Sequence, residues 1–253
     1  MLKTVLLILL LLLTGCKPVQ VANDAASATL TLYSSNEAIG IDDSFVTKIE
    51  AADPYTSGAD IVITDLVEGI DKIDFNTYKL LALYQAEPYL IIASKDNYAY
   101  GNCGYLADDE RAKVLLKEVK ADLNLYYFKE YANITELLEA FSSGSISSIL
   151  VCQSTYWWYK GECGFELYEN ENLNELYRLK NGFSFLPKEG IFVKQAVINN
   201  YLNDLLKITN TVRQSANSDS SIQNIKMASE AYDATQYYLS LFDQQLNEKM
   251  IVR

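Results

Sequence analysis

The sequence predicts an α/β fold, in which strands and helices alternate along most of the 253 residues. Short apolar runs rich in β-branched residues, typical of strands, are separated by stretches with apolar residues at helical spacing. One run, GADIVIT at 58–64, contains consecutive apolar residues at 61–63, as expected for a strand covered on both faces. Asn133, with Glu136 three residues later, has the pattern of a capping box at the start of a helix.

The first half of the chain contains the clearest strand signals. The run ATLTLYS at 28–34 alternates, is β-branched and predicts the first strand. A short apolar pattern at 45–49 predicts a helix. Residues 78–84 and 89–94 form a long extended run, which Pro88 interrupts because proline cannot donate a ladder hydrogen bond.

The second half repeats the alternation and ends in a tail that we expect to be helical. Apolar residues at helical spacing and polar caps define the helices, and short apolar runs define the strands. We expect helices at 106–119, 133–144, 195–215 and within 220–250, and strands at 123–128, 146–152, 183–186 and 190–193.

The N-terminus has the pattern of an export signal. Lys3 precedes an apolar run at 5–13, which is too short to span a membrane. The run ends in Leu-Thr-Gly-Cys at 13–16, which resembles a bacterial lipobox in which Cys16 is lipidated. We therefore expect a signal peptide at 1–15 and a lipidated, flexible tether at 16–28; an ordinary signal peptide with a chance cysteine is the alternative.

Export changes the meaning of the remaining cysteines, because disulfides persist outside the cytoplasm. Cys103 and Cys163 both lie in a Gly-x-Cys-Gly-aromatic context with turn-forming residues, and we expect them to form a disulfide. Cys152 ends an apolar run and is expected to be a buried thiol. Three free thiols are the alternative.

Composition excludes several classes of function. The net charge of −12 argues against nucleic acid as a partner, since phosphate binding needs clustered Lys and Arg. The chain has no histidine, which removes Ser-His-Asp and Cys-His catalysis and Cys/His zinc sites. No GxSxG or GxxxxGK[ST] motif is present. We therefore expect neither an enzyme nor a metal or cofactor.

Three segments together resemble a known family. GADIVITDL followed by YKLLALYQAEPYLIIASK resembles the first lobe of ABC-transporter substrate-binding proteins of the periplasmic type II fold. ITELLEAFSSGSISSILVCQSTY resembles the matching unit of the second lobe, with Ser147 in place of the usual Asp, and FLPKEGIFVKQAVINNYLNDLLKIT resembles the final return to the first lobe. The nearest branch is that of the sulfonate, nitrate and thiamine-pyrimidine binders.

The resemblance implies a two-lobed protein with a hinge, which closes on a small-molecule solute and delivers it to an ABC permease. Lobe 1 would comprise 29–92 and 183–253, with the C-terminal helices, and lobe 2 would comprise 93–182. With an acylated Cys16, the protein would be a monomer anchored in the bilayer on the extracytoplasmic side of a bacterial cell membrane. Lobe 1 departs from the family in length, since only about thirty residues separate its first strand from GADIVI.

Candidate site residues follow from the rule that ligands of open α/β sheets lie at the carboxyl ends of strands. Three predicted strands end in short polar residues, and a fourth group lies at the presumed hinge. Local capping or hinge packing is the alternative role for each group, and part of the aromatic block after 155 must lie in the core. The candidates are Ser34, Ser35, Asn36, Thr64, Asp65, Tyr84, Glu87, Gln153, Thr155, Tyr156 and Trp157.

The arginines bear on the class of solute. There are four in the chain, and none directly follows a predicted strand end. A cleft with tyrosine, tryptophan, Asp65 and Glu87 favours a neutral or cationic solute that contains a ring, such as a vitamin precursor or an amine. A surface lipoprotein that keeps the fold without transporting a solute is the main alternative, supported by the short first lobe. An exported hydrolase is a further one.

Overall fold

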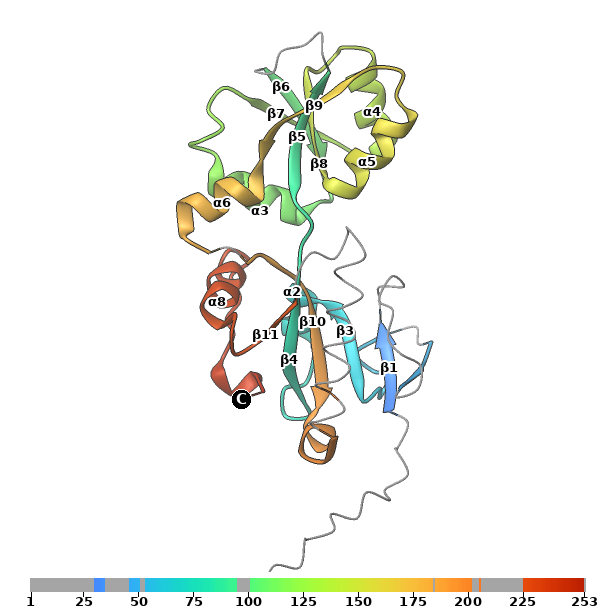
Figure 1. Cartoon of the computed structure of the whole chain (residues 1–253), viewed down its shortest axis with the longest axis vertical. Helices are drawn as coiled ribbons and strands as arrows, with labels where there is room; N and C mark the ends of the chain where they lie inside the picture. Colours follow the sequence, from blue (N-terminus) through green and yellow to red (C-terminus); the bar gives the residue numbers. More distant parts are fainter. Residues whose placement is uncertain are drawn as a thin grey trace, which may run out of the picture.

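The computed structural model describes residues 30–34, 46–50, 53–94, 101–183, 185–201, 205 and 225–252. These residues form two α/β lobes, one above the other in Figure 1, each built on its own sheet. The predicted alternation of strands and helices is confirmed as a whole. Individual elements differ, because 46–48 form a strand rather than a helix, the strand expected at 123–128 lies at 127–131, and 185–186 are not in a strand. None of the described helices has both the length and the apolar character needed to cross a bilayer.

The first lobe contains a six-stranded sheet with the order β11-β4-β10-β3-β1-β2. The three strands at one side of the sheet run parallel, and the return strand from the other lobe is antiparallel to both of its neighbours. The strands are β1 (Leu30–Ser34), β2 (Val46–Lys48), β3 (Ile61–Asp65), β4 (Tyr78–Gln85), β10 (Pro187–Lys194) and β11 (Ile225–Met227).

The second lobe contains a five-stranded sheet with the order β7-β6-β8-β5-β9. Its strands are β5 (Tyr89–Ser94), β6 (Asn102–Leu106), β7 (Tyr127–Tyr131), β8 (Ser148–Cys152) and β9 (Leu167–Asn172). Three parallel strands are again followed by an antiparallel strand that arrives from the other lobe. Both lobes therefore have the same strand order, and the first lobe has all of its parallel strands despite its short N-terminal segment.

Helices cover both sheets and begin at the caps that the sequence supplies. Asn133 caps α4, where its side chain accepts a hydrogen bond from Glu136 N at 3.0 Å, and the helix ends before Gly144 (φ +74°). That predicted start and end are confirmed. The helices are α2 (Leu66–Lys72), α3 (Glu110–Val119), α4 (Ile134–Ser142), α5 (Gln153–Glu162), α6 (Leu173–Asn181), α8 (Tyr232–Ser240) and the 3₁₀ turn η1 (Glu248–Met250); residues 195–201 are also helical.

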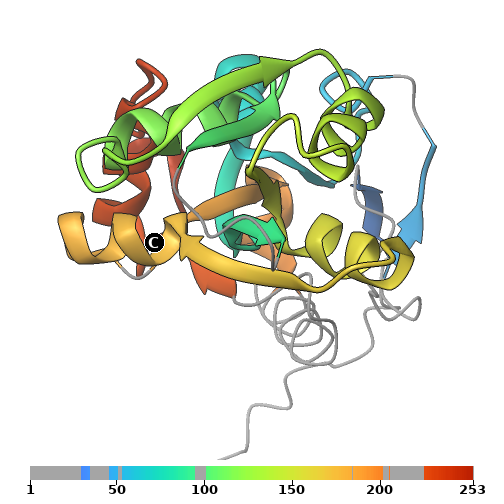
Figure 2. The same cartoon turned by 90° about the horizontal axis from the view of Figure 1, so that it is seen from above.

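The C-terminal tail differs from the expected helical tail. Residues 225–227 form β11, which pairs with β4 and extends the first sheet, and only then does α8 begin. Helix α8 lies beside α6 of the second lobe in both views (Figures 1 and 2), and the Tyr237 hydroxyl lies 2.9 Å from both Glu118 and Asn181 oxygens. The tail therefore joins the two lobes.

Two chain crossings link the lobes, at 86–88 between β4 and β5 and at 182–186 between α6 and β10. Ala86 N donates to Leu186 O at 2.8 Å, so the two crossings lie side by side. The predicted boundary lay after residue 92, whereas β5 already belongs to the second sheet from Tyr89 onwards. The structure thus places the first crossing a few residues earlier.

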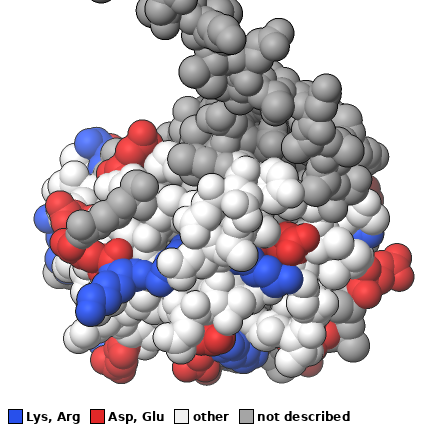
Figure 3. Space-filling view, turned by 90° about the horizontal axis from the view of Figure 1, so that it is seen from below, with Lys and Arg blue, Asp and Glu red and all other residues white. Residues whose placement is uncertain are grey.

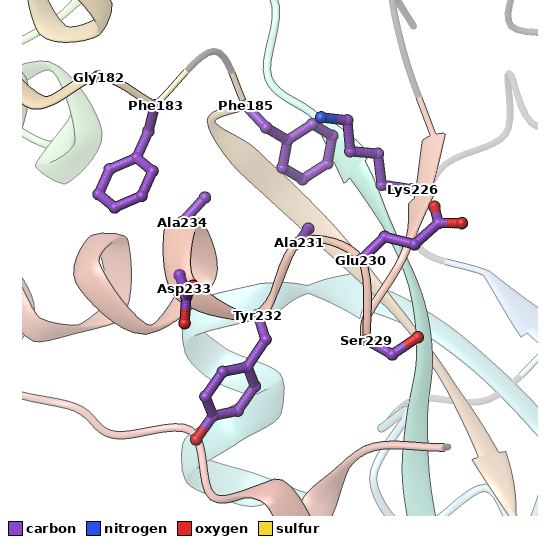
Figure 4. A pocket seen from close by; sticks show the side chains of 10 residues that line it. All are labelled: Gly182, Phe183, Phe185, Lys226, Ser229, Glu230, Ala231, Tyr232, Asp233 and Ala234. Atoms are coloured by element: carbon purple, nitrogen blue, oxygen red, sulfur yellow. The ribbon is translucent and has the colours of Figure 1, made fainter.

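A cavity of about 280 Å³ lies where the second crossing meets the start of α8 (Figure 4). Phe183 and Phe185 extend from the crossing on one side, and the turn between β11 and α8 forms the other. The Lys226 ammonium lies 5.2 Å from the centre of the Phe185 ring, a cation–π distance. The Phe183 ring lies 5.5 Å from that of Tyr237, so aromatic packing holds α8 against this crossing.

The largest buried cluster spans both lobes. It joins α2 and Phe192 of the first lobe to α3, α6 and Leu150 of the second, with Tyr238 of α8 among them. The opposite face of each sheet has its own separate cluster. Figure 3 shows acidic and basic side chains interspersed on the lower end of the first lobe, with no patch of one sign among the described residues.

The expected disulfide is wrong. Cys103 and Cys163 are both free thiols in the structure. Cys103 on β6 belongs to the same buried cluster as Ile91 of β5. Cys163, at the end of α5, packs against a different cluster, which contains the next residue of β5, Ile92. Since neighbouring residues of a strand face opposite sides, the two thiols lie on opposite faces of the second sheet and cannot meet. Cys152 is also free and is only half-buried.

Candidate functional site

A cavity of about 630 Å³ lies between the lobes. It is bounded by the turn from β3 into α2 on the first lobe and by the turn from β6 into α3 on the second. Both turns are at carboxyl ends of parallel strands, where ligands of such sheets bind. The lining residues are Asp65, Val67, Glu68, Tyr89, Leu106, Asp108, Asp109, Glu110, Arg111 and Phe242.

An ion pair across this cavity joins the lobes. The Asp65 carboxylate caps α2 through a 3.1 Å bond from Glu68 N. Its other oxygen is paired with Arg111 Nη2 of the second lobe, and the same nitrogen donates to Lys188 O of β10 at 2.7 Å. The Arg111 side chain is 12% exposed and that of Asp65 38%, so the pair is only partly screened by water.

A second capping carboxylate lies on the other side of the cavity. Asp109 caps α3 by accepting from Ala112 N at 3.0 Å, and it accepts the Tyr89 hydroxyl at 3.0 Å. Burial raises the pKa of Tyr89 far above its ordinary value, and the Asp109 charge adds to the effect, so the phenol remains a neutral donor. The start of β5 is thereby tied to α3 beside the cavity.

The cavity is strongly acidic. Asp65, Glu68, Asp108, Asp109 and Glu110 are five of the ten lining residues, and one arginine opposes them. Two of the five have lysine partners outside the cavity, at 3.6 Å for Glu68 and 2.8 Å for Glu110. Because Arg111 already neutralises Asp65, the remaining carboxylates leave an excess of negative charge. Such a site favours a solute with a cationic group.

A further polar group lies at the first crossing. Both Glu87 carboxylate oxygens accept from Ser154, from its backbone N at 2.7 Å and its hydroxyl at 3.1 Å. Gln153 N donates to Pro88 O at 2.9 Å, and Thr155 Oγ1 lies 3.2 Å from Cys152 Sγ. Glu87 and the start of α5 thus lie together, and a carboxylate of the protein itself already occupies that helix N-terminus.

Several predicted residues lie elsewhere. Tyr84 is buried in the cluster on the outer face of the first sheet, and Tyr156 is buried in the second lobe's core, so neither reaches a solute. Thr64 is buried beside the Tyr55 hydroxyl, 3.3 Å away. Trp157 is 54% exposed on α5 and is not among the residues that line the cavity between the lobes.

The candidates after the first strand are only partly described. Ser34 ends β1 and is half-buried. Ser35 and Asn36, together with the lipidation residue Cys16, lie outside the described residues.

Sequence reasoning missed Arg111, Asp109 and Tyr89. It assigned the Gly-Asn-Cys-Gly segment before residue 105 to a turn, so β6 was overlooked and the strand-end rule was not applied after it. The signal was nevertheless present, because Asp108 and Asp109 directly precede an amphipathic helix, which is typical of a helix cap.

Comparison with known proteins shows a likeness in structure alone. No protein-family model matches the sequence, and no curated protein matches it. An ABC transporter from Parabacteroides distasonis has a TM-score of 0.66 at 10% identity, over 89% of this chain and 99% of that one. The periplasmic aliphatic sulphonate binding protein SsuA from Escherichia coli has a TM-score of 0.58 at 9% identity, over 89% and 92%.

A TctC solute binding protein from Polaromonas has a TM-score of 0.55 at 13% identity, over 85% of this chain and 98% of that one. Together with the repeated strand order, these similarities confirm the two-lobed fold of the periplasmic binding proteins that the sequence resemblance implied.

Proposed function

We propose that this protein is an extracytoplasmic solute receptor, which binds a small molecule between its lobes and delivers it to an ABC permease. The observation that carries the proposal is the cavity of about 630 Å³ between the carboxyl ends of β3 and β6. Its volume lies within the usual range for small-molecule sites. Two of the named structures are a solute binding protein and a sulphonate binding protein, which supports binding without catalysis.

The mode of attachment in this proposal rests on the sequence. The short apolar run before Cys16 and the Leu-Thr-Gly-Cys pattern support acylation of that residue. Two acyl chains suffice for stable anchoring, because each buried CH₂ contributes about 0.8 kcal/mol. An anchor on the outer side of the membrane would keep the receptor beside its permease.

The residues that line the cavity change the class of solute that we expect. Stacking on Tyr156 loses its support because that ring is in the core, and the argument from missing arginine fails because Arg111 lies in the cavity. The acidic lining supports the other part of the expectation, a cationic group on the solute. The alternative of a lipoprotein without a solute also loses its main support, since the first lobe has β1, β2 and β3.

Thermal-shift screening of the chain from residue 23 onwards tests the proposal. The panel contains amines, amino acids, vitamins, sugars and sulfonates. A solute at a hundredfold excess over its Kd raises stability by about 2.7 kcal/mol, which is a clear shift in Tm. Asp109→Ala should reduce the shift, and the exposed carboxylate variant Asp122→Ala serves as the matched control. A flat response of the wild-type protein to every compound would refute the receptor function.

A further inference from the structure

The Arg111 guanidinium has one nitrogen in use and one without a partner. Nη2 donates to both Asp65 and Lys188 O, whereas Nη1 is buried and has no hydrogen-bond partner among the described residues. A buried donor left unsatisfied costs about 1–3 kcal/mol, and more for a charged group. Arg111 also lines the cavity between the lobes, so a solute bound there is a candidate for the missing acceptor.

A second unpartnered polar atom belongs to the same region. The Tyr238 hydroxyl is buried and has no partner in the described part of the chain. Its ring lies 5.2 Å from that of Phe242, which lines the cavity. Burial raises the pKa of Tyr238 to about 12, with Arg111 acting to lower it and Asp65 and Asp109 to raise it. The phenol is therefore neutral and near these charged groups, with its proton free to donate.

The surrounding charge restricts which acceptor can enter. Four of the five lining carboxylates remain after Asp65 is paired with Arg111, and two of these, Asp108 and Asp109, have no lysine partner among the described residues. A simple anion that approached Arg111 would face this negative excess. A molecule that carries a cationic group beside its oxyanion would instead be attracted both to Arg111 and to the unpaired carboxylates.

We propose that the solute is a small zwitterion, whose carboxylate accepts from Arg111 Nη1 and whose cationic group faces Asp108 and Asp109. The inference rests on the proposed receptor function and names its substrate class. It assigns Arg111 two roles, since Nη2 joins the lobes while Nη1 binds the solute. Tyr238, whose buried hydroxyl also lacks a partner among the described residues, is the second donor in this proposal.

Isothermal titration calorimetry with matched probes tests the assignment. Each standard amino acid and glycine betaine is compared with its amine, which lacks the carboxylate, and with its acid, which lacks the cationic group. We expect at least one zwitterion to bind and both matched partners to bind more than tenfold more weakly. A charged hydrogen bond of this kind is worth about ten- to a hundredfold in Kd.

Variants locate the interaction. Arg111→Lys should weaken the zwitterion by about ten- to a hundredfold while a point charge remains, because lysine lacks the second fork nitrogen. Tyr238→Phe keeps the packing of the ring and should weaken binding of the zwitterion severalfold. The exposed Arg178→Lys is the matched control and should leave Kd unchanged. Circular dichroism checks that each variant is folded.

The outcomes separate the two proposals. Tight binding of amines or simple anions only, or a zwitterion Kd that is unaffected by Arg111→Lys and Tyr238→Phe, overturns the zwitterion inference and leaves the receptor function standing. No binding by any compound of this set or of the wider panel overturns both.

Discussion

Replacing Asp65 by Asn tests the ion pair with Arg111 that joins the two lobes across the cavity. Asparagine is as good a helix cap as aspartate, so α2 keeps its N-terminal hydrogen bond while the charge disappears. Arg111, only 12% exposed, is then left without its counter-ion. Loss of the ion pair is thereby separated from loss of the cap.

The magnitude follows from the burial of the two partners. Breaking a fully buried ion pair costs about 3–5 kcal/mol, and an exposed pair is worth about 0–1 kcal/mol. Asp65 is 38% exposed, and Lys188 O still accepts from Arg111, so the expected loss in the free energy of unfolding is about 1.5–3 kcal/mol. For a chain of this size the loss corresponds to a fall in Tm of about 3–12 °C.

Urea unfolding followed by circular dichroism measures the loss. Glu175→Gln is the control, since it removes a carboxylate from the exposed pair with Arg178, whose side chains are 45% and 50% exposed. A double-mutant cycle with Arg111→Gln then gives the coupling energy of the pair. This reasoning would be refuted if the free energy of unfolding of Asp65→Asn lay within about 0.5 kcal/mol of the wild-type value, or if its loss were no larger than that of Glu175→Gln.

Three further outcomes are expected. Glu87→Gln should lower the free energy of unfolding by about 0.5–2 kcal/mol in urea melts, because it removes the charge from the carboxylate that caps α5 through Ser154; an unchanged midpoint would contradict the cap. In non-reduced peptide maps Cys103 and Cys163 should be unlinked, and Cys103 should react with a thiol reagent only after unfolding, since burial raises its pKa to about 12. Cys16→Ser should release the protein from membranes, and retention after a carbonate wash would exclude the acyl anchor.

The fold was largely predictable because its strands and caps are local signals. Residues 61–63 of the run at 58–64 are consecutive apolar residues, and they lie in β3, whose first four residues are buried. Asn133 and Glu136 marked the start of α4 correctly. The order of the strands in space could not be read from local signals, and the family resemblance implied only the two-lobed arrangement.

The missed strand β6 has a specific cause. Gly104 suggested a turn, but it lies in the middle of the strand because α4 packs directly on it. A Cβ at this position would lie 2.5 Å from Leu137 Cδ1 and 2.7 Å from Ile146 Cδ1. The glycine is therefore required by tertiary packing, which a local pattern of turn residues does not reveal.

The aromatic candidates failed for a related reason. Proximity to a strand end places a residue near the site, but the face of the helix or strand decides where its side chain points. On α5, Tyr156 and Tyr159 are buried while Trp157 and Trp158 are exposed, so the helix turns its two tyrosines to the core. Tyr84 likewise lies on the outer face of its strand.

The geometry of Arg111 decides how a solute affects the lobes. A guanidinium has five donors in a rigid plane, so an oxygen bound to Nη1 leaves the bonds from Nη2 to Asp65 and Lys188 O in place. A cationic solute that took the Asp65 carboxylate would instead break the pair and leave a buried guanidinium uncompensated, at a cost of several kcal/mol. Binding through Nη1 therefore adds to the link between the lobes, whereas binding through Asp65 would remove it. A solute whose binding strengthens the link between the lobes must therefore be one that leaves Asp65 with Arg111.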